Sequence, residues 1–316
     1  MADLITSAYA IQQIGGSLPT GYSSVLPDAI TTASELVQRF CQRDFVITTY
    51  DDSYSSLGFS AFLTRQYPVT VVSRVATGLQ TVITISNTDA TTNQRATAAL
   101  TNTVDTATNV ITATGITLVR VASGVTTTDT STVFATYPTL QSVADHINGL
   151  GGGWNASVLT GYTLWPSSDL KPIQGAQGAL AGVNGEGAQL QAFTNDVNGW
   201  NCDYPTGRIQ LNAQQWDPVF ALMNLGSSPL QATFPPGFDN VRVVYTAGYV
   251  TIPFAVQQAT LITVQDLVWK MMRPQFFKSE NAKDYSYTLN EVKQGGLPKE
   301  ASDLLLAGGW KSYRRY

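Results

Sequence analysis

The side chains that most often carry catalysis or metal binding are few and widely separated in this chain. There is one histidine, His146, and there are two cysteines, Cys41 and Cys202, without CxxC spacing. A structural zinc site uses about four cysteine or histidine ligands, so a conventional zinc site is not expected. We expect Cys41 and Cys202 to be free buried thiols, with a disulfide as the alternative. His146 is expected to be a surface or core residue rather than a catalyst.

Two other stretches have residue types that could bind a charged group. Asp51 and Asp52 are adjacent carboxylates and could hold a cation, but a solvated turn is the simpler interpretation. The sequence GVNGEG (residues 182–187) is rich in glycine. It does not follow a strand and open a helix, as a phosphate-binding loop does, so we expect no phosphate site there.

Motifs of the common enzyme classes are missing from the sequence. It contains no GxSxG, HExxH or Walker A pattern, and these patterns place a nucleophile, a zinc ion or a nucleotide. Carboxylates that meet only in the folded chain are the one catalytic option that the sequence leaves open. We therefore expect a protein that is not an enzyme and that has no cofactor and no metal.

Aromatic side chains offer a possible binding surface. Trp154, Trp165 and Trp200 flank the glycine-rich stretch and could form a carbohydrate-binding or protein-binding patch. The alternative is that they serve as packing residues in the core.

Composition limits the class of protein and its partners. The chain has 316 residues, of which 43% are hydrophobic and only 13% charged, with a net charge of −4. A nucleic-acid grip needs clustered Lys and Arg, so the acidic balance argues against one. The N-terminus has no basic segment before an apolar one, and no apolar run reaches the length of a membrane span. We expect synthesis in the cytoplasm and no contact with a membrane.

The sequence pattern divides the chain into two parts: residues 1–75 together with 201–316, which mix helix and strand patterns, and residues 76–200, which differ in composition. The stretch PDAITTASELVQRFCQRDF has apolar residues at helical spacing, and FLTRQYPVTVVSRVA is typical of a strand. Residues after 201 predict a strand at VRVVYTAGY with Val241, Val243 and Tyr245 on one face, and a helix from Pro253 to Met272. They also predict a short helix at PKEASDLLLA, with Pro298 in its first turn and glycines after it. The stretch SENAKDYSYTLNEVK is a further helix candidate.

Residues 76–200 are rich in Thr and poor in charge, with short alternating runs separated by turn formers. This pattern is typical of a β-sandwich or a small barrel. One helix is expected at TLQSVADHINGLGG, and GAQGALAGVNGEGAQLQ is expected to be an extended surface loop. We predict an α+β fold, in which a helical core with a small β-sheet carries an inserted, Thr-rich, β-sandwich-like domain.

The helix from Pro253 to Met272 has apolar residues around nearly its whole circumference. A helix of this kind is buried on several sides, so either the insert or a neighbouring copy of the chain is expected to cover it. The residues assigned to this contact are Leu261, Val264, Leu267, Val268, Trp269, Met271 and Met272. Gly248, Tyr249 and Pro253 are expected to form the turn between strand and helix, with Gly248 at positive φ.

Four stretches in this order resemble the head–tail connector (adaptor) proteins of tailed bacteriophages. They are DAITTASELVQRFCQRDF, YPVTVVSRV, DYPTGRIQL and VRVVYTAGYVTIPFAVQQATLITVQDLVWKMM. The resemblance covers residues 1–75 and 201–275, about half of the chain, and its most specific part is the strand, the AGY, the proline and the helix. Residues 76–200 depart from the pattern, because members of the family have a short hairpin there.

The resemblance implies a structural virion protein located at the head–tail junction. Such proteins form a ring of about twelve copies. The portal protein lies above the ring, a tail terminator, stopper or tail tube protein lies below it, and DNA passes through the lumen without specific binding. The insert would then contact collar or fibre proteins. The alternative is a β-rich adhesin or glycan-binding tail or neck protein.

The resemblance also implies a C-terminal arm, residues 296–316, that reaches the portal. Gly308 and Gly309 would act as a hinge, and deletion of residues 308–316 is expected to leave the fold intact and to abolish docking. Aromatic and cationic side chains of this kind dominate protein interfaces. The expected portal contacts are Trp310, Lys311, Tyr313, Arg314, Arg315 and Tyr316.

Overall fold

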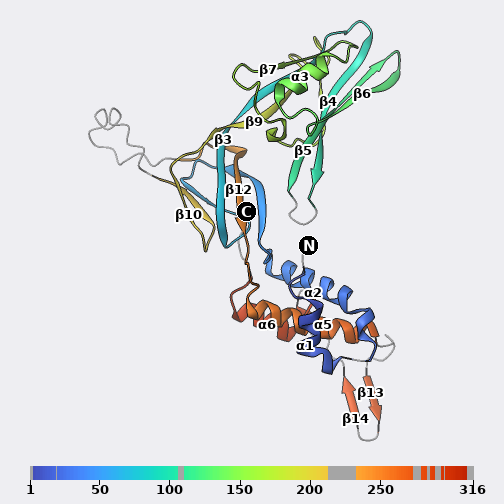
Figure 1. Ribbon diagram of the computed structural model, residues 1–316, viewed down its shortest axis with the longest axis vertical. Helices are drawn as coiled ribbons and strands as arrows, with labels where there is room; N and C mark the ends of the chain where they lie inside the picture. Colours follow the sequence, from blue (N-terminus) through green and yellow to red (C-terminus); the bar gives the residue numbers. More distant parts are fainter. Residues whose placement is uncertain are drawn as a thin grey trace, which may run out of the picture.

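A computed structural model describes residues 3–18, 20–105, 110–212, 233–272, 279–282, 285–288, 293–294 and 296–311. The described chain is elongated, with a helical bundle at one end, a small β-sandwich in the middle and a larger β domain at the other end (Figure 1). The predicted α+β class is confirmed, since the described chain contains both a bundle of α-helices and several antiparallel sheets, with helix α3 packed on one of the β domains.

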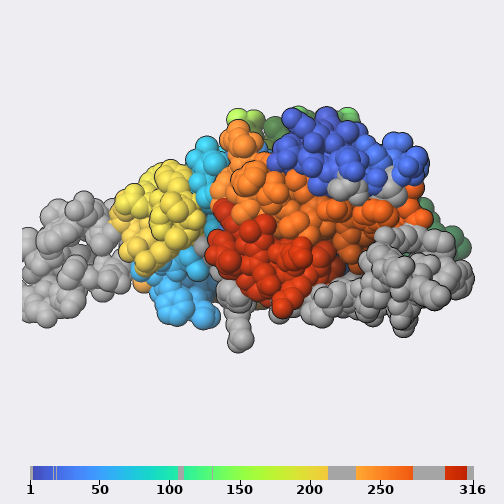
Figure 2. All heavy atoms as spheres, turned by 90° about the horizontal axis from the view of Figure 1, so that it is seen from below, coloured from blue at the N-terminus to red at the C-terminus, as the bar shows by residue number. Residues whose placement is uncertain are grey.

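The helical bundle is formed by segments from both ends of the chain. In Figure 2 the blue N-terminal helices lie on one side of orange α5 and the red α6 on the other. Helix α2 follows the predicted pattern, with Pro27 in its first turn and one buried face packed on α5. The helices are α1 (Ser7–Ile14), α2 (Leu26–Cys41), α5 (Phe254–Met272) and α6 (Lys299–Ala307).

Two small hairpins follow α5. The helix expected at SENAKDYSYTLNEVK is wrong, because strands β13 (Ser279–Ala282) and β14 (Tyr285–Thr288) form an antiparallel pair there. Strands β15 (Lys293–Gln294) and β16 (Leu297–Pro298) pair next and lead into α6. Strand β14 contains two Tyr residues and one Thr, which are residue types that favour a strand over a helix.

Two sheets form the middle β-sandwich. The strand predicted at VRVVYTAGY is confirmed as β12 (Gly237–Ala247), between β1 (Thr48–Ser56) and β3 (Val69–Asn87). A second sheet has the order β10 (Trp200–Asp203), β11 (Arg208–Leu211) and β2 (Ala61–Leu63). The two sheets share one core, to which β12 contributes Val241, Val243 and Tyr245 from a single face, as predicted.

Strand β3 is long enough to run from the middle sandwich into the larger β domain. Its first part pairs with β12, and its later part pairs with β7 and β9. A second sheet, in the order β6–β5–β4–β8, shares one hydrophobic core with the later part of β3. The remaining strands are β4 (Asn93–Val104), β5 (Ile111–Ala122), β6 (Val125–Val133), β7 (Trp154–Val158), β8 (Ala176–Gly178) and β9 (Ala188–Asp196).

Two predictions inside this domain have different outcomes. The predicted helix is confirmed as α3 (Leu140–Asn148), whose Leu140, Val143 and Ile147 enter the domain core. The stretch GAQGALAGVNGEGAQLQ is not one surface loop. It supplies β8 and the start of β9, and Leu180 between them is buried. Glycine-rich sequence concealed these strands because it has little alternation to show.

Candidate interaction sites at the strand-to-helix turn and the C-terminal arm

The turn between β12 and α5 depends on a glycine. Gly248 has φ 115°, as the positive-φ prediction required, and its N–H donates to the Pro68 carbonyl at 2.9 Å. A Cβ at this position would lie 2.6 Å from the Val46 carbonyl oxygen and 2.8 Å from Ile47 backbone atoms. Backbone on both sides thus closes around the turn, and only glycine fits there without displacement.

Helix α5 is covered by helices of its own chain and not by the insert, which corrects the first of the two covers that we expected. Leu261, Val264 and Val268 are buried against α1 and α2, so in this structure they are not available to a neighbouring copy. Leu267, Trp269 and Met272 are half-buried. Met271 is the exposed member of the predicted contact set, with 46% of its surface accessible.

The exposed apolar surface of this region lies mainly at the start of α5. Val250 is 84% exposed and Phe254 is 71% exposed, and Pro253 lies between them in sequence. The Pro253 carbonyl accepts the N–H of Val256 at 2.9 Å and so opens the helix as predicted. Large apolar side chains that stay in water at one place mark a surface that a protein partner can cover.

The first part of the expected C-terminal arm, residues 296–316, is not free, because Leu297, Leu305 and Trp310 pack on their own chain. The Trp310 ring centroid lies 6.1 Å from that of Phe45 and 6.0 Å from that of Tyr249, edge-to-face in both cases. The Trp310 N–H donates to the Leu305 carbonyl at 3.0 Å and turns the chain back after α6. Trp310 is therefore a core residue of the strand-to-helix turn, and Gly308–Gly309 lead into that contact rather than into a free arm.

A buried arginine completes this aromatic cluster. Arg43 is 5% exposed, and its guanidinium lies 4.4 Å from the Tyr67 ring centroid and 5.5 Å from that of Trp310. Its Nη2 donates to the Tyr249 hydroxyl at 2.9 Å. Within the described part of the chain no carboxylate pairs with Arg43, so aromatic ring faces supply its electrostatic stabilisation. No local pattern in the sequence indicates Arg43, because its hydrogen-bond partner is 206 positions away.

The rest of the arm has one described residue. Lys311 lies with its ammonium 4.8 Å from the Phe40 ring centroid. Tyr313, Arg314, Arg315 and Tyr316 lie outside the described residues. Deletion from residue 308 would remove Trp310 from the core, so that truncation is no longer expected to leave the fold intact.

The other candidate residues are structural. Asp51 and Asp52 are not in a turn but on β1, where they point to opposite faces: Asp51 pairs with Arg242, and Asp52 accepts from Arg65 and Tyr245. His146 stacks on Tyr137 with ring centroids 4.2 Å apart.

The three tryptophans do not form one patch. Trp154 and Trp165 belong to the core of the large β domain, whereas Trp200 belongs to that of the middle sandwich. Trp154 is 5% exposed, and its Nε1 donates to Asp129 at 2.7 Å. The cysteines are free as expected, with Cys41 buried and Cys202 half-buried. Burial raises the pKa of the Cys41 thiol to about 12.

The core of the middle sandwich contains three tyrosines whose ionisation is suppressed. Burial, together with nearby carboxylates, raises the pKa of Tyr50, Tyr54 and Tyr245 well above the ordinary value. The Tyr54 and Tyr245 hydroxyls both donate to Asp52, at 3.1 and 2.8 Å, and Tyr50 donates to Asp44 at 3.0 Å. Each phenol is thus held in its protonated form.

These tyrosines predict a loss of stability in alkaline solution. Above pH about 10 the unfolded chain releases phenolic protons that the folded chain keeps, so the free energy of unfolding falls by about 1.4 kcal/mol per pH unit for each tyrosine. Urea denaturation between pH 9 and 11 measures this slope. The variant Tyr245→Phe is expected to reduce it by about a quarter, because the Cys41 thiol, whose pKa is also raised, adds to the slope in this range. An equal slope in both proteins would contradict the assignment of Tyr245.

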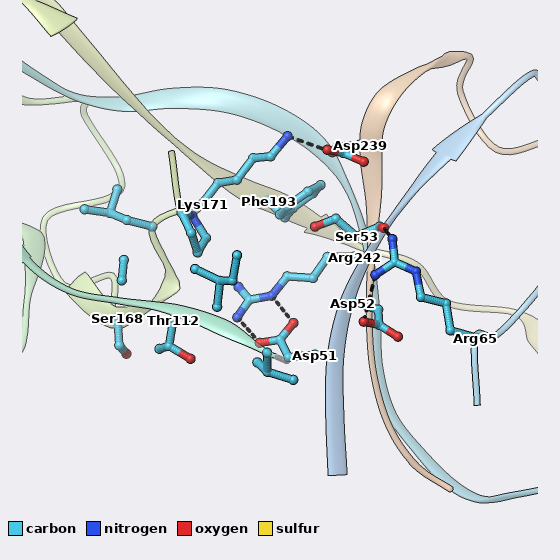
Figure 3. A pocket seen from close by; sticks show the side chains of 15 residues that line it. Asp51, Asp52, Ser53, Arg65, Thr112, Ser168, Lys171, Phe193, Asp239 and Arg242 are labelled. Atoms are coloured by element: carbon cyan, nitrogen blue, oxygen red, sulfur yellow. Dashed lines mark hydrogen bonds and ion pairs between the residues drawn. The ribbon is translucent and has the colours of Figure 1, made fainter. Parts of the chain in front are cut away.

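A cleft lies between the middle sandwich and the large β domain. Its volume is about 220 Å³. Figure 3 shows the residues that line it. Asp51 and Arg242 come from β1 and β12 of the middle sandwich, and Thr112, Ser168 and Lys171 come from the large β domain. Burial lowers the pKa of Lys171, whose Nζ donates to the Asp239 carbonyl at 3.0 Å. Two ion pairs at the cleft, Asp51–Arg242 and Asp52–Arg65, lie within the middle sandwich. The contacts of Lys171 with the Asp239 carbonyl and of Arg242 with Asp169 connect the two β domains.

Comparison with known proteins does not assign the chain to a family. No family model matches the chain, and no curated protein matches it. Among the described residues, no group of three or more His, Cys, Asp or Glu side chains is placed to hold a metal ion. Within the same residues, no helix combines the length and the apolar character that crossing a membrane requires.

Proposed function

We propose that this chain is a structural virion protein of a tailed bacteriophage, an adaptor that forms a ring between the portal vertex and the tail. The observation that carries the proposal is the folded unit of residues 241–272, where the resemblance is most specific. Strand β12, the Gly248 turn and α5 form one continuous element on which the N- and C-terminal helices pack. No enzymatic activity and no cofactor are part of the proposal.

The proposal uses the surface that the bundle leaves open. The exposed Val250 and Phe254 at the start of α5 would contact the neighbouring copy in a ring of about twelve. The portal would lie above the ring and a terminator, stopper or tail tube protein below it. DNA would pass through the lumen. A protein with net negative charge does not bind DNA tightly, because the phosphates are also negative. The large β domain would face outward, where collar or fibre proteins are located.

The alternative, a β-rich adhesin or glycan-binding protein, was supported in the sequence by three tryptophans that could form one binding patch. A glycan site of this kind needs aromatic faces gathered on one open surface. Trp154, Trp165 and Trp200 belong instead to two separate cores.

Electron microscopy of the purified chain mixed with the portal protein tests the proposal. A ring of about twelve copies on the portal is the expected result. Label on the large β domain of intact particles should appear at the neck. Label at fibre tips or at the distal end of the tail would overturn the adaptor function in favour of the adhesin.

A matched pair of variants tests the surface. Phe254→Asp places a charge in the proposed contact and should reduce ring assembly by at least about tenfold, since burying an unpaired charge is costly. Phe238→Asp changes another exposed phenylalanine, 83% accessible, at the opposite end of β12 and should assemble as the wild type does. Equal assembly of both variants would exclude the start of α5 as the contact.

A further inference from the structure

The large β domain is joined to the rest of the molecule by a narrow neck. Residues 76–81 of β3 pair with residues 191–196 of β9, and these two strands form the neck (Figure 1). The hydrophobic core on one side of the neck includes Val82 and Ala192, while the core on the other side includes Val75 and Val197. A connection with separate cores at its two ends permits relative motion unless other contacts prevent it.

The neck contains two features that bend a strand. Gly78 has φ 71° in the middle of β3, and its carbonyl accepts the Thr194 hydroxyl at 2.9 Å. The pairing register of β3 with β9 then shifts between Thr81 and Ile83. A glycine at positive φ and a bulge are both places where a strand changes direction. The neck is thus built as a bend rather than as a straight ribbon.

One carboxylate connects the two sides of this bend. Asp169 belongs to the large β domain, because Leu170 bridges to Ala192 and the Lys171 N–H donates to the Gln191 carbonyl at 2.8 Å. Its carboxylate accepts from Arg242 Nη1 at 3.1 Å, and Arg242 is on β12 of the middle sandwich.

The same carboxylate also binds the strand that passes through the neck. Asp169 accepts from Arg74 Nη1 at 2.9 Å, and Arg74 binds Asp196 on β9 at 2.7 Å. Arg242 is in turn held by both carboxylate oxygens of Asp51, at 2.8 and 2.6 Å. All but one of these side chains are less than a third exposed, Asp196 being the exception. Networks of partly buried, charge-assisted hydrogen bonds fix geometry more firmly than single surface pairs do.

We propose that the neck is an elbow that pivots at Gly78 and that the Asp169 carboxylate locks it at one angle. With the lock intact, the large β domain has one orientation relative to the middle sandwich. With the carboxylate lock broken, the described contacts that remain there include the two-stranded neck, the tether from Lys171 to the Asp239 carbonyl, and the hydrogen bond from Arg242 Nη1 to the Asp169 carbonyl at 3.4 Å. The domain then swings about Gly78. The cleft in Figure 3 opens and closes with that motion, since its walls come from both sides of the elbow.

The lock also predicts sensitivity to salt. At about 1 M salt the Debye length is about 3 Å, which weakens ion pairs that water can reach. Partly buried pairs are screened less than exposed ones, so added salt should loosen the lock in the same direction as removal of the Asp169 carboxylate, but to a smaller degree. Neither effect requires ring assembly, so the elbow can be tested on the isolated chain whatever its partners are.

Distances between two spin labels measure the elbow directly. Ser131→Cys on β6 and Gln210→Cys on β11 are exposed positions on opposite sides of the neck. Cys202→Ser removes the half-buried native thiol, and Cys41 is buried. The labelled wild type should give one narrow distance distribution. Asp169→Ala should broaden it at least about twofold, and about 1 M NaCl should broaden the wild type but change Asp169→Ala little.

A matched control separates the lock from a general effect of charge removal. Asp145→Ala removes an exposed carboxylate of α3, in the same domain, that binds the Gln141 amide and should leave the distribution narrow. Arg242→Lys keeps the charge but loses the bidentate geometry and should broaden the distribution. Distributions for Asp169→Ala and Arg242→Lys that both coincide with the wild-type distribution would overturn the elbow, and the milder Arg242→Lys decides this even if Asp169→Ala folds poorly.

Discussion

Gly248→Ala is expected to destabilise the protein by about 3–5 kcal/mol, among the largest effects of any single methyl group in this chain. Two costs add at this position. A non-glycine residue at φ 115° is strained, and the added Cβ would lie 2.6 Å from the Val46 carbonyl oxygen. That oxygen is backbone and cannot rotate away as a side chain would. Urea denaturation followed by circular dichroism measures the loss.

Gly58→Ala is the matched control, because it separates backbone strain from the clash. Gly58 has φ 84°, and nothing lies within 4 Å of a Cβ built there. The strain alone should cost about 1 kcal/mol. If the two variants lose the same free energy, the close approach of Val46 is not what requires glycine at 248. If Gly248→Ala is as stable as the wild type, the described geometry of the turn is wrong.

The elements around this turn could be predicted because their signals are local. Apolar residues at helical spacing predicted α2, and the proline that opens PKEASDLLLA and the glycines after it predicted α6. Alternation predicted β12 with Val241, Val243 and Tyr245 on one face. Gly248 and Pro253 follow β12 within a few residues, so the turn could be predicted from the same window. Patterns of this kind depend on the periodicity of one element and need no knowledge of its neighbours.

What covers α5 could not be predicted, although its burial could. Apolar residues around the whole helix indicated several partners, but they do not say which segments those partners are. The structure gives this role to α1, α2 and α6. Trp310 was assigned to a free arm for a similar reason: its partners Phe45 and Tyr249 are distant in sequence, and nothing near residue 310 indicates them.

The lock at the neck was beyond sequence analysis for a physical reason. Arg74 and Asp169 are 95 positions apart, and Arg242 and Asp51 are 191 positions apart. A salt bridge needs two charges within about 4 Å, which only the folded sheet provides. In the sequence these residues are ordinary polar positions on strands or in loops. The same holds for Arg43, which looks like part of a solvated helix end and is in fact buried among aromatic rings.

Truncation of the C-terminus at two positions should have clearly different effects on stability. Deletion of residues 308–316 removes Trp310 from Phe45 and Tyr249 and opens the cluster around Arg43, which should cost about 2–4 kcal/mol in the free energy of unfolding. Deletion of residues 312–316 leaves Trp310 and Lys311 in place and should change stability by less than about 0.5 kcal/mol. Urea denaturation of both proteins and of Trp310→Ala makes the comparison.

The same two truncations separate packing from docking. Trp310→Ala should lose nearly as much stability as the longer deletion, because the ring accounts for most of the contact. If the arm reaches a portal, the shorter deletion should abolish docking while the protein stays as stable as the wild type, since it removes Tyr313, Arg314, Arg315 and Tyr316. Normal docking by that protein would exclude the arm as the portal contact. Full stability of the longer deletion would show instead that Trp310 is not part of the core.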